Sequence, residues 1–297
     1  MKKESLIMFC RVVEEGSISQ AARVSYVSQP AVTSQIRQLE KHYGVALFDR
    51  TSGKLVLTKA GSALYPYAKE IIAAYDYSEE VVKSIAHQDA VTLSVGASLT
   101  IGEYLLPNIL GEFRKEFNNL KIKLTIGSTP NIMSSLEKRD IDIGLVEGIV
   151  TQTDVQSEKF GRDELILVIP KSHRWHQRDA INIEELVGEN LIWREENAGI
   201  REIVENLLKE HQLLDKVNSY MELGSTQAIK SAVEAGLGIS ILPKSSILKE
   251  LELGVLKHLP LIGIQMNRDL WLVRIPSRFP KESVRSFVAH LKKQMTK

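Results

Sequence analysis

The chain has a single cysteine, Cys10, among its 297 residues, and this scarcity excludes an intramolecular disulfide. It also argues against a zinc site built from cysteine ligands. Cys10 shares one face of an expected helix with Leu6, Phe9 and Val13. We therefore interpret it as a thiol of the core and not as a redox sensor.

Long apolar runs are missing as well. No segment approaches the roughly 20 apolar residues that a membrane-spanning helix needs. The N-terminus, MKKESLIMFCRVVEEGS, has no apolar stretch of signal-peptide length, because Arg11, Glu14 and Glu15 interrupt it. We expect a cytoplasmic protein that makes no membrane contact.

The familiar motifs of catalytic and nucleotide-binding sites are also absent. The sequence contains no G-x-S-x-G, H-E-x-x-H, Walker loop or G-x-G-x-x-G. His173 and His176 have a spacing that a metal could use, but Lys171, Arg174 and Arg178 crowd them with positive charge. We interpret this segment as a solvated loop. The prediction is a protein that is not an enzyme and holds no metal or cofactor.

The formal net charge of +1 conceals an asymmetry along the chain. Residues 1–60 hold nine Lys and Arg against five Asp and Glu, whereas the remaining 29 and 32 leave residues 61–297 slightly acidic. A basic N-terminal region on an acidic body favours nucleic acid as a partner of the N-terminal region only.

Residues 17–61 carry the pattern of a winged helix-turn-helix. Ser17 with Gln20 fits a capping box that opens a short helix, and Ser28 fits the N-cap of a second. Two short strands around a Thr-Ser-Gly-Lys tip follow, and then a long helix begins. This order predicts a DNA-binding domain.

The second helix has one apolar and one polar face. Val32, Ile36 and Leu39 recur at helical spacing and predict its buried stripe. The opposite face and the wing carry residue types that bind base edges and phosphates, namely Gln29, Thr33, Ser34 and Arg37 on the helix and Arg50, Thr51 and Lys54 in the wing. The alternative is an ordinary helix pair with a solvated face. The coincidence of helix, turn, helix and wing in one order favours DNA binding.

The stretch S-x-S-x-A-A…S-Q-P-A-V-T-x-Q-I-R-x-L-E, with G-x-x-L-F-x-R and L-T-x-A-G after it, resembles the N-terminal domain of LysR-type transcriptional regulators. The resemblance is specific over residues 4–90 and continues more weakly through the rest. It implies a homo-oligomer, usually a tetramer, that binds double-stranded operator DNA and senses a small molecule, with RNA polymerase as a further candidate partner. On this resemblance Pro30 joins the recognition helix, where it acts through van der Waals contact.

Apolar residues at helical spacing continue from Thr58 to about His87. A helix of about 28 residues is over 40 Å long, too long for one small domain to cover. The resemblance implies that the same helix of a second subunit packs against it, antiparallel, in a homodimer. The alternative is that the helix folds back on its own domain.

Residues 91–297 alternate strand-like and helical segments. Strands are expected at 91–97, 121–127, 141–146, 164–170, 190–193, 218–223, 239–243 and 271–275, and helices at 101–117, 130–139, 200–212, 226–236 and 281–296. Such alternation predicts parallel sheets with helices on both faces.

The predicted fold class is therefore α+β, with a winged helix-turn-helix (1–58), a linker helix (59–88) and an α/β effector domain (89–297). The effector domain resembles the two-lobed periplasmic solute-binding fold. We expect lobe one at 91–161 and 267–297 and lobe two at 162–266, with crossings near 160–163 and 262–267.

Ligands of open α/β folds bind beyond the carboxyl ends of strands, near helix N-termini. Hydroxyl-rich junctions of this kind comprise Ser98, Leu99 and Thr100, then Ser128 and Thr129, then Ser225 and Thr226. Each could instead be a helix cap, as Thr100 with Glu103 or Thr129 with Pro130. Ser98 has no evident capping role and is the strongest candidate.

In the second lobe the family often has small or hydroxyl residues after an Arg-Glu-Glu segment. This chain has Ala198 and Ile200 there, so Asn197 or Arg201 could take that role. We expect a small anion or carboxylate as effector. The run GASLTIGEYLLP is similar to family members controlling sulfur or carbon assimilation. The alternative function is a cytoplasmic solute-binding or metabolic protein that uses its N-terminal helices only for assembly.

Overall fold

The computed structural model describes residues 2–49, 55–87, 90–117, 119–148, 155–196, 198–277 and 279–295. Contacts within the chain divide it into two compact units. The first comprises residues 1–91 with 277–281, and the second comprises 92–276 with 282–297. Each unit has its own buried core.

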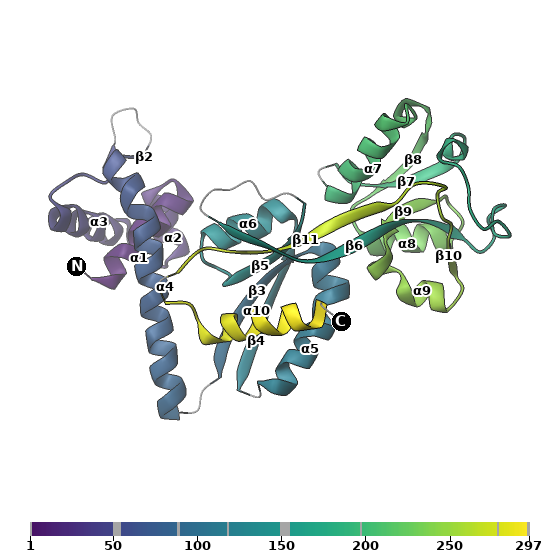
Figure 1. Cartoon of the computed structure of the whole chain (residues 1–297). Coiled ribbons are helices and arrows are strands. Elements are labelled where there is room, and N and C mark those ends of the chain that lie inside the picture. Colours follow the sequence, from purple (N-terminus) through teal and green to yellow (C-terminus); the bar gives the residue numbers. More distant parts are fainter. Residues whose placement is uncertain are drawn as a thin grey trace. The chain divides into compact units, whose positions relative to one another are not determined.

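The first unit has the element order that the sequence predicted (Figure 1). Its elements are α1 (Lys3–Glu15), α2 (Ile18–Val24), α3 (Gln29–Tyr43), β1 (Phe48–Asp49), β2 (Val56–Leu57) and α4 (Lys59–His87). The helices α1, α2 and α3 enclose an apolar core that includes Leu6, Phe9 and Ile36. This arrangement is a helix-turn-helix followed by a two-stranded hairpin.

Local capping explains where α2 and α3 begin. The hydroxyl of Ser17 accepts a hydrogen bond from the amide of Gln20, and that of Ser28 accepts one from the amide of Ala31, both at 3.4 Å. Gly44 ends α3 with φ of 70°, a conformation that glycine adopts without a steric penalty.

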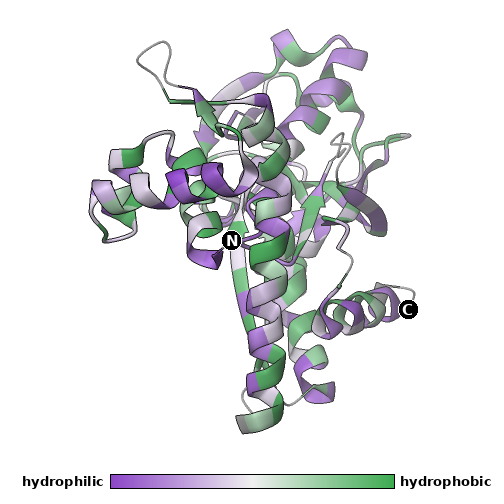
Figure 2. Ribbon diagram, turned by 90° about the vertical axis from the view of Figure 1, so that its left-hand side faces the viewer, coloured by the Kyte–Doolittle hydropathy of each residue, from purple (hydrophilic) through white to green (hydrophobic). Residues whose placement is uncertain are grey.

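The helix α4 is continuous from Lys59 to His87, with Pro66 in its interior. Its first half packs on the core of the first unit, where Ala68 is buried and Nζ of Lys69 lies 2.6 Å from Oε1 of Glu14. Apolar residues also recur along its length (Figure 2). Several of them are exposed: Tyr67, Ile71, Tyr75, Val82 and Ile85. Folding back therefore covers only part of the apolar stripe.

The second unit contains strands and helices in alternation (Figure 1). Its strands are β3 (Val91–Ser98), β4 (Leu120–Gly127), β5 (Ile143–Glu147), β6 (Gln156–Pro170), β7 (Asn190–Arg194), β8 (Asn218–Leu223), β9 (Ser240–Pro243), β10 (Leu256–His258) and β11 (Met266–Arg274). Its helices are η1 (Ile101–Leu105), α5 (Leu106–Glu116), α6 (Thr129–Glu137), η2 (Ile183–Leu186), α7 (Gly199–Glu210), η3 (Leu214–Lys216), α8 (Thr226–Glu234), η4 (Lys244–Ser246), α9 (Leu248–Glu252) and α10 (Glu282–Met295).

The main sheet is mixed, which corrects the expectation of parallel sheets. Its order is β10-β6-β11-β5-β3-β4, with β9 also paired to β6. Within this sheet β3 and β5 are parallel, whereas β6 runs antiparallel to β9, β10 and β11. The strands β7 and β8 form a separate parallel pair. The chain runs between the lobes along β6 and returns in the opposite direction along β11, and these two strands pair with each other.

Two lobes with separate cores form the second unit. One core gathers around Leu93, Phe113 and Phe287, and another around Leu167 and Trp175. The strands β6 and β11 join the lobes as one antiparallel pair, from Gln156 opposite Arg274 to Leu165 opposite Met266 (Figure 1). A two-lobed effector domain is therefore present, as predicted.

None of the helices in the described ranges is both long and apolar enough to cross a membrane.

Candidate DNA interface and effector site

The helix α3 presents the polar face that the sequence predicted. Val32, Ile36 and Leu39 are buried against α1 and α2. On the opposite side Gln29, Pro30, Ser34 and Arg37 are exposed and Thr33 is half-buried. The hydroxyl of Thr33 donates to the carbonyl of Gln29 at 3.0 Å, so its proton is engaged while its lone pairs stay free to accept.

All five of these residues line one shallow groove along α3, together with Gln38 and Lys41. Gln38 and Lys41 were not among the residues predicted from the sequence. Their signal was available, because Gln38 follows Ser34 and Lys41 follows Arg37 at i+4 on the same helical face. Lys41 adds a second cation to a surface that has the donors and acceptors needed for phosphates and base edges.

The wing is anchored to α3 by a carboxylate. Oε1 of Glu40 accepts hydrogen bonds from the amides of Leu47 at 2.9 Å and Phe48 at 3.4 Å. The hairpin then pairs Phe48 with Leu57 and Asp49 with Val56. This anchoring fixes the base of the wing relative to α3. The predicted tip residues Arg50, Thr51 and Lys54 lie outside the described residues.

The first predicted effector junction follows β3. The side chain of Ser98 is almost fully buried, and its Oγ has no hydrogen-bond partner among the described residues. Leu99 is half-buried and Thr100 is buried. A buried hydroxyl without a partner is unfavourable, so Ser98 has free capacity for a ligand.

Thr100 does not form the predicted alternative, a capping box with Glu103. Its side chain makes no cap hydrogen bond, and its backbone is already helical. The following turn, η1, is a π-helix in which the amide of Leu106 donates to the carbonyl of Ile101. Pro107 has no amide to continue the ordinary ladder, which favours this wider turn.

The second junction is a helix start. The N-cap of α6 is Ser128 and not Thr129, and the Ser128 side chain makes no cap bond. The hydroxyl of Thr129 donates to the carbonyl of Glu147 at 3.4 Å. The predicted alternative, an N-cap at Thr129, is therefore wrong by one residue.

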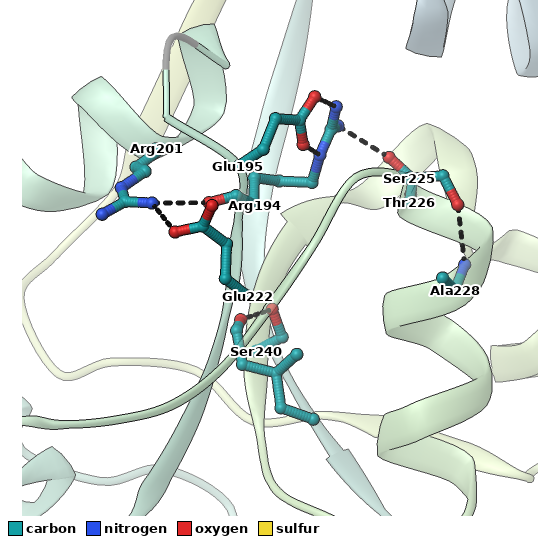
Figure 3. A network of polar contacts seen from close by, with 9 residues as sticks. Arg194, Glu195, Arg201, Glu222, Ser225, Thr226, Ala228 and Ser240 are labelled. Carbon is teal, nitrogen blue, oxygen red and sulfur yellow. Dashed lines mark hydrogen bonds and ion pairs between the residues drawn. The ribbon is translucent and has the colours of Figure 1, made fainter.

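The third junction meets a buried arginine (Figure 3). Ser225 is the N-cap of α8 and accepts from the amide of Ala228 at 3.1 Å, so its role is structural. Oγ1 of Thr226 lies 3.2 Å from Nη1 of Arg194, the last residue of β7. Both side chains are buried. The sequence analysis did not assign a role to Arg194.

Arg201 is paired with two carboxylates in this structure. Its Nε lies 2.8 Å from Glu205, and its Nη1 lies 2.5 Å from Glu222 and 3.0 Å from the carbonyl of Arg194 (Figure 3). Its hydrogen bonds to the carboxylates of Glu205 and Glu222 raise the pKa of Arg201 above its ordinary value. The other predicted residue of this segment, Asn197, lies outside the described residues.

Tyr104 of η1 joins the two lobes. Its hydroxyl lies 3.5 Å from Oε1 of Gln227, and Nζ of Lys230 lies 4.8 Å from the centre of its ring. Burial, with smaller contributions from Glu103 and Glu250, raises the pKa of Tyr104 to about 12, while the charge of Arg194 opposes the shift. Arg194, Lys230 and Tyr104 therefore share one polar region between the lobes.

No hydrogen bond in the described part of the chain joins Ser98, Ser128 and Ser225 to one another. Thr226 is brought to Arg194, a contact not predicted from the sequence because the two residues are 32 positions apart.

His173 contacts the carboxylate of Glu189, which lies 16 residues away in the sequence. Its Nε2 lies 3.2 Å from Oε2 of Glu189, which also pairs with Arg174. Within the described ranges no three His, Cys, Asp or Glu side chains are grouped so that they could hold a metal ion.

Comparison with known proteins assigns both parts of the chain. Residues 4–62 match the family described as bacterial regulatory helix-turn-helix protein, lysR family, and residues 86–296 match the LysR substrate binding domain. A probable RuBisCO transcriptional regulator of Cyanidioschyzon merolae is 32% identical over 288 residues, which cover 96% of this chain and 95% of that protein.

Solved structures share the fold. The regulatory domain of CcmR from Synechocystis PCC6803 in complex with 2-PG superposes with a TM-score of 0.63 and 24% identity, covering 69% of this chain and 97% of that one. Full-length CbnR complexed with its target DNA has a TM-score of 0.61 and 22% identity, covering 99% of both chains. With the helix-turn-helix, the two-lobed domain and these matches in agreement, the chain belongs to the LysR family of DNA-binding transcriptional regulators.

Proposed function

We propose that this regulator reads a specific operator through the exposed face of α3 and responds to a small anionic metabolite bound between the lobes of its effector domain. The observation that carries the DNA-binding half is the groove along α3. It brings Gln29, Thr33, Ser34 and Arg37 together on a helix whose other face is fully buried. Arg and Gln side chains placed in a major groove can discriminate bases.

Dimerisation through the second half of α4 fits this role. The exposed residues Tyr75, Val82 and Ile85 need a partner surface, and the family forms homo-oligomers. A second copy would present a second α3. Two such helices read a pseudo-palindromic site whose half-sites are about one helical turn or a multiple of it apart.

Binding of an anion is supported by three features of the effector domain. The unpartnered Oγ of Ser98 is free to donate. Arg194 and Lys230 supply buried positive charge, and α8 begins beside Arg194. The regulatory domain of CcmR, which has the same fold, forms a complex with 2-PG.

The DNA-binding proposal is tested by selection from a random duplex library with the full-length chain. We expect enrichment of one sequence with two related half-sites. Recovery of duplexes with no shared sequence would contradict sequence-specific recognition.

The effector proposal is tested by thermal unfolding of the full-length chain with 2-PG, inorganic phosphate and a panel of organic acids. We expect at least one anion to raise the unfolding temperature of the wild type and to do so less in Ser98→Ala. Ser62→Ala, which removes an exposed hydroxyl in the first unit, is the matched control. An unchanged unfolding temperature with every anion would contradict an anionic effector.

A further inference from the structure

The guanidinium of Arg194 is buried, and its hydrogen-bond donors are arranged to bind a carboxylate or a similar anion. Its side chain is 5% exposed. Nε and Nη2 donate to the two carboxylate oxygens of Glu195, each at 2.7 Å, and Nη1 donates to Oγ1 of Thr226 at 3.2 Å (Figure 3). Two parallel bonds from one guanidinium are the geometry with which arginine recognises carboxylates and phosphates.

The two partners of this ion pair differ in their access to water. Glu195 is 36% exposed, so its carboxylate is the solvent-facing half of the pair. Moving Glu195 into water would return its hydration, whereas the side chain of Arg194 is buried. Withdrawal of Glu195 without a replacement would strand a buried charge, which is strongly unfavourable. A second anion must therefore take the place of Glu195 when it leaves.

The ionisation of Glu195 is consistent with this competition. Burial opposes its ionised form, yet the hydrogen bonds from Arg194 hold the pKa of Glu195 below its ordinary value. The carboxylate is therefore charged at neutral pH and is a full competitor for any anion that approaches Arg194.

A second buried cation and a helix N-terminus lie near Arg194. Lys230 is 6% exposed and is held by Oε1 of Glu250 at 2.7 Å and by the carbonyl of Ser246 at 3.0 Å. The N-terminal turn of α8 also begins here, with Ser225 satisfying only the amide of Ala228 through its side chain. Tyr104 of lobe one contacts the same helix at Gln227. A ligand on Arg194 would thus lie where the two lobes meet.

We propose that Glu195 is an internal competitor for the effector: its carboxylate occupies the Arg194 guanidinium, and a ligand with a carboxylate or phosphate group displaces it. This inference rests on the proposed effector function. It assigns recognition of the anion to Arg194. It also means that the observed affinity equals the intrinsic affinity multiplied by the fraction of molecules in which Glu195 has released Arg194.

Isothermal titration of the full-length chain tests the proposal with two probes, inorganic phosphate and glycolate, which separate phosphate from carboxylate recognition. In Glu195→Gln the neutral amide keeps the shape of the side chain but not its charge. We expect this variant to bind at least one probe at least fivefold more tightly than the wild type. The gain should disappear in the double variant Glu195→Gln/Arg194→Met.

Glu222→Gln is the matched control, because Glu222 is the carboxylate on the neighbouring Arg201 in the same network (Figure 3). Its affinities should stay within twofold of the wild type. If Glu195→Gln fails to fold, Glu195→Asp shortens the same side chain by one methylene and should also tighten binding, because the shorter carboxylate cannot reach both nitrogens.

Equal affinities in the wild type and the Glu195 variants would overturn the competitor role. If the wild type still binds an anion in that case, the proposed effector function stands and only this inference fails. Absence of binding by every variant overturns the inference, and thermal unfolding with the wider panel then decides separately on the effector function.

Discussion

Nη2 of Arg268 on β11 lies 2.9 Å from Oδ2 of Asp163 on β6, inside the strand pair that joins the two lobes. Nη1 of the same guanidinium lies 3.1 Å from Glu147 at the end of β5. Asp163 also accepts from the hydroxyl of Ser245 in η4 at 2.9 Å. One buried cation thus links the connecting strands to an element of each lobe.

Replacing Arg268 with Met should destabilise the effector domain by about 3–5 kcal/mol, since the change leaves Asp163 and Glu147 buried without their cation. Denaturant unfolding of the full-length chain measures this loss. Arg162→Met is the control, because Arg162 is 59% exposed and pairs with Asp269 at 3.2 Å. That change should alter stability by less than about 1 kcal/mol. Similar losses in both variants would argue against the buried cluster.

Cys10 should be inert in the folded chain. Burial raises the pKa of its thiol to about 12, while Lys69 opposes the shift. We expect no reaction with a disulfide reagent at pH 8 until denaturant is added, because the thiolate is the reactive form. Prompt labelling of the native chain would contradict this.

The same thiol should make stability depend on pH in the alkaline range. Above its ordinary value of about 9 the thiol ionises in the unfolded chain but stays protonated in the folded one up to about 12. The contribution of Cys10 to the free energy of unfolding should therefore fall as pH rises from about 9 towards 12. Cys10→Ala should lose less stability than the wild type over that interval.

The exposed stripe of α4 should control the oligomeric state. Val82 is 65% exposed, and Val82→Glu would place a charge in the proposed dimer interface. Sedimentation analysis should show a shift towards monomer. Lys83→Glu, one residue away on a different face of the helix, should leave the oligomer intact. An unchanged oligomer in Val82→Glu would rule out this part of α4 as the interface.

Gly44 should be required for its backbone conformation alone. Its φ is 70°, and a Cβ there would meet no atom within 4 Å. We expect Gly44→Ala to lower the free energy of unfolding by about 1 kcal/mol through backbone strain. Gly111→Ala, inside α5 and equally free of contacts, should be neutral or stabilising by roughly 0.5–1 kcal/mol. A loss of the same size at both positions would contradict the argument from φ.

The sequence was most informative where structure depends on neighbouring residues. The N-caps at Ser17 and Ser28 and the stripe of Val32, Ile36 and Leu39 are local features that appear as predicted, although only the Ser17 half of the capping box with Gln20 is present. The full length of β6 was not predicted, because its first residues, QSEKFGRD, show no strand alternation. They form a strand because β11 pairs with them.

Site residues that depend on distant contacts were harder to predict. Arg201 pairs with Glu222, which lies 21 residues away in the sequence. The contact between Tyr104 and Gln227 joins residues 123 positions apart, and no local sequence pattern predicts it. Thr100 and Glu103 match the capping-box motif. The backbone of Thr100 is already helical before the π-turn, so the extended N-cap conformation that a capping box needs is absent.

DNA binding through α3 is tested most directly by fluorescence anisotropy of Arg37→Ala on the selected operator, beside Lys209→Ala, which removes an exposed cation from the effector domain. Loss of a base or phosphate contact by Arg37 should weaken binding by about 1–3 kcal/mol, roughly tenfold or more. Lys209→Ala should bind within twofold of the wild type. Wild-type affinity in Arg37→Ala, at the same salt concentration, would contradict the assignment of α3 as the recognition helix.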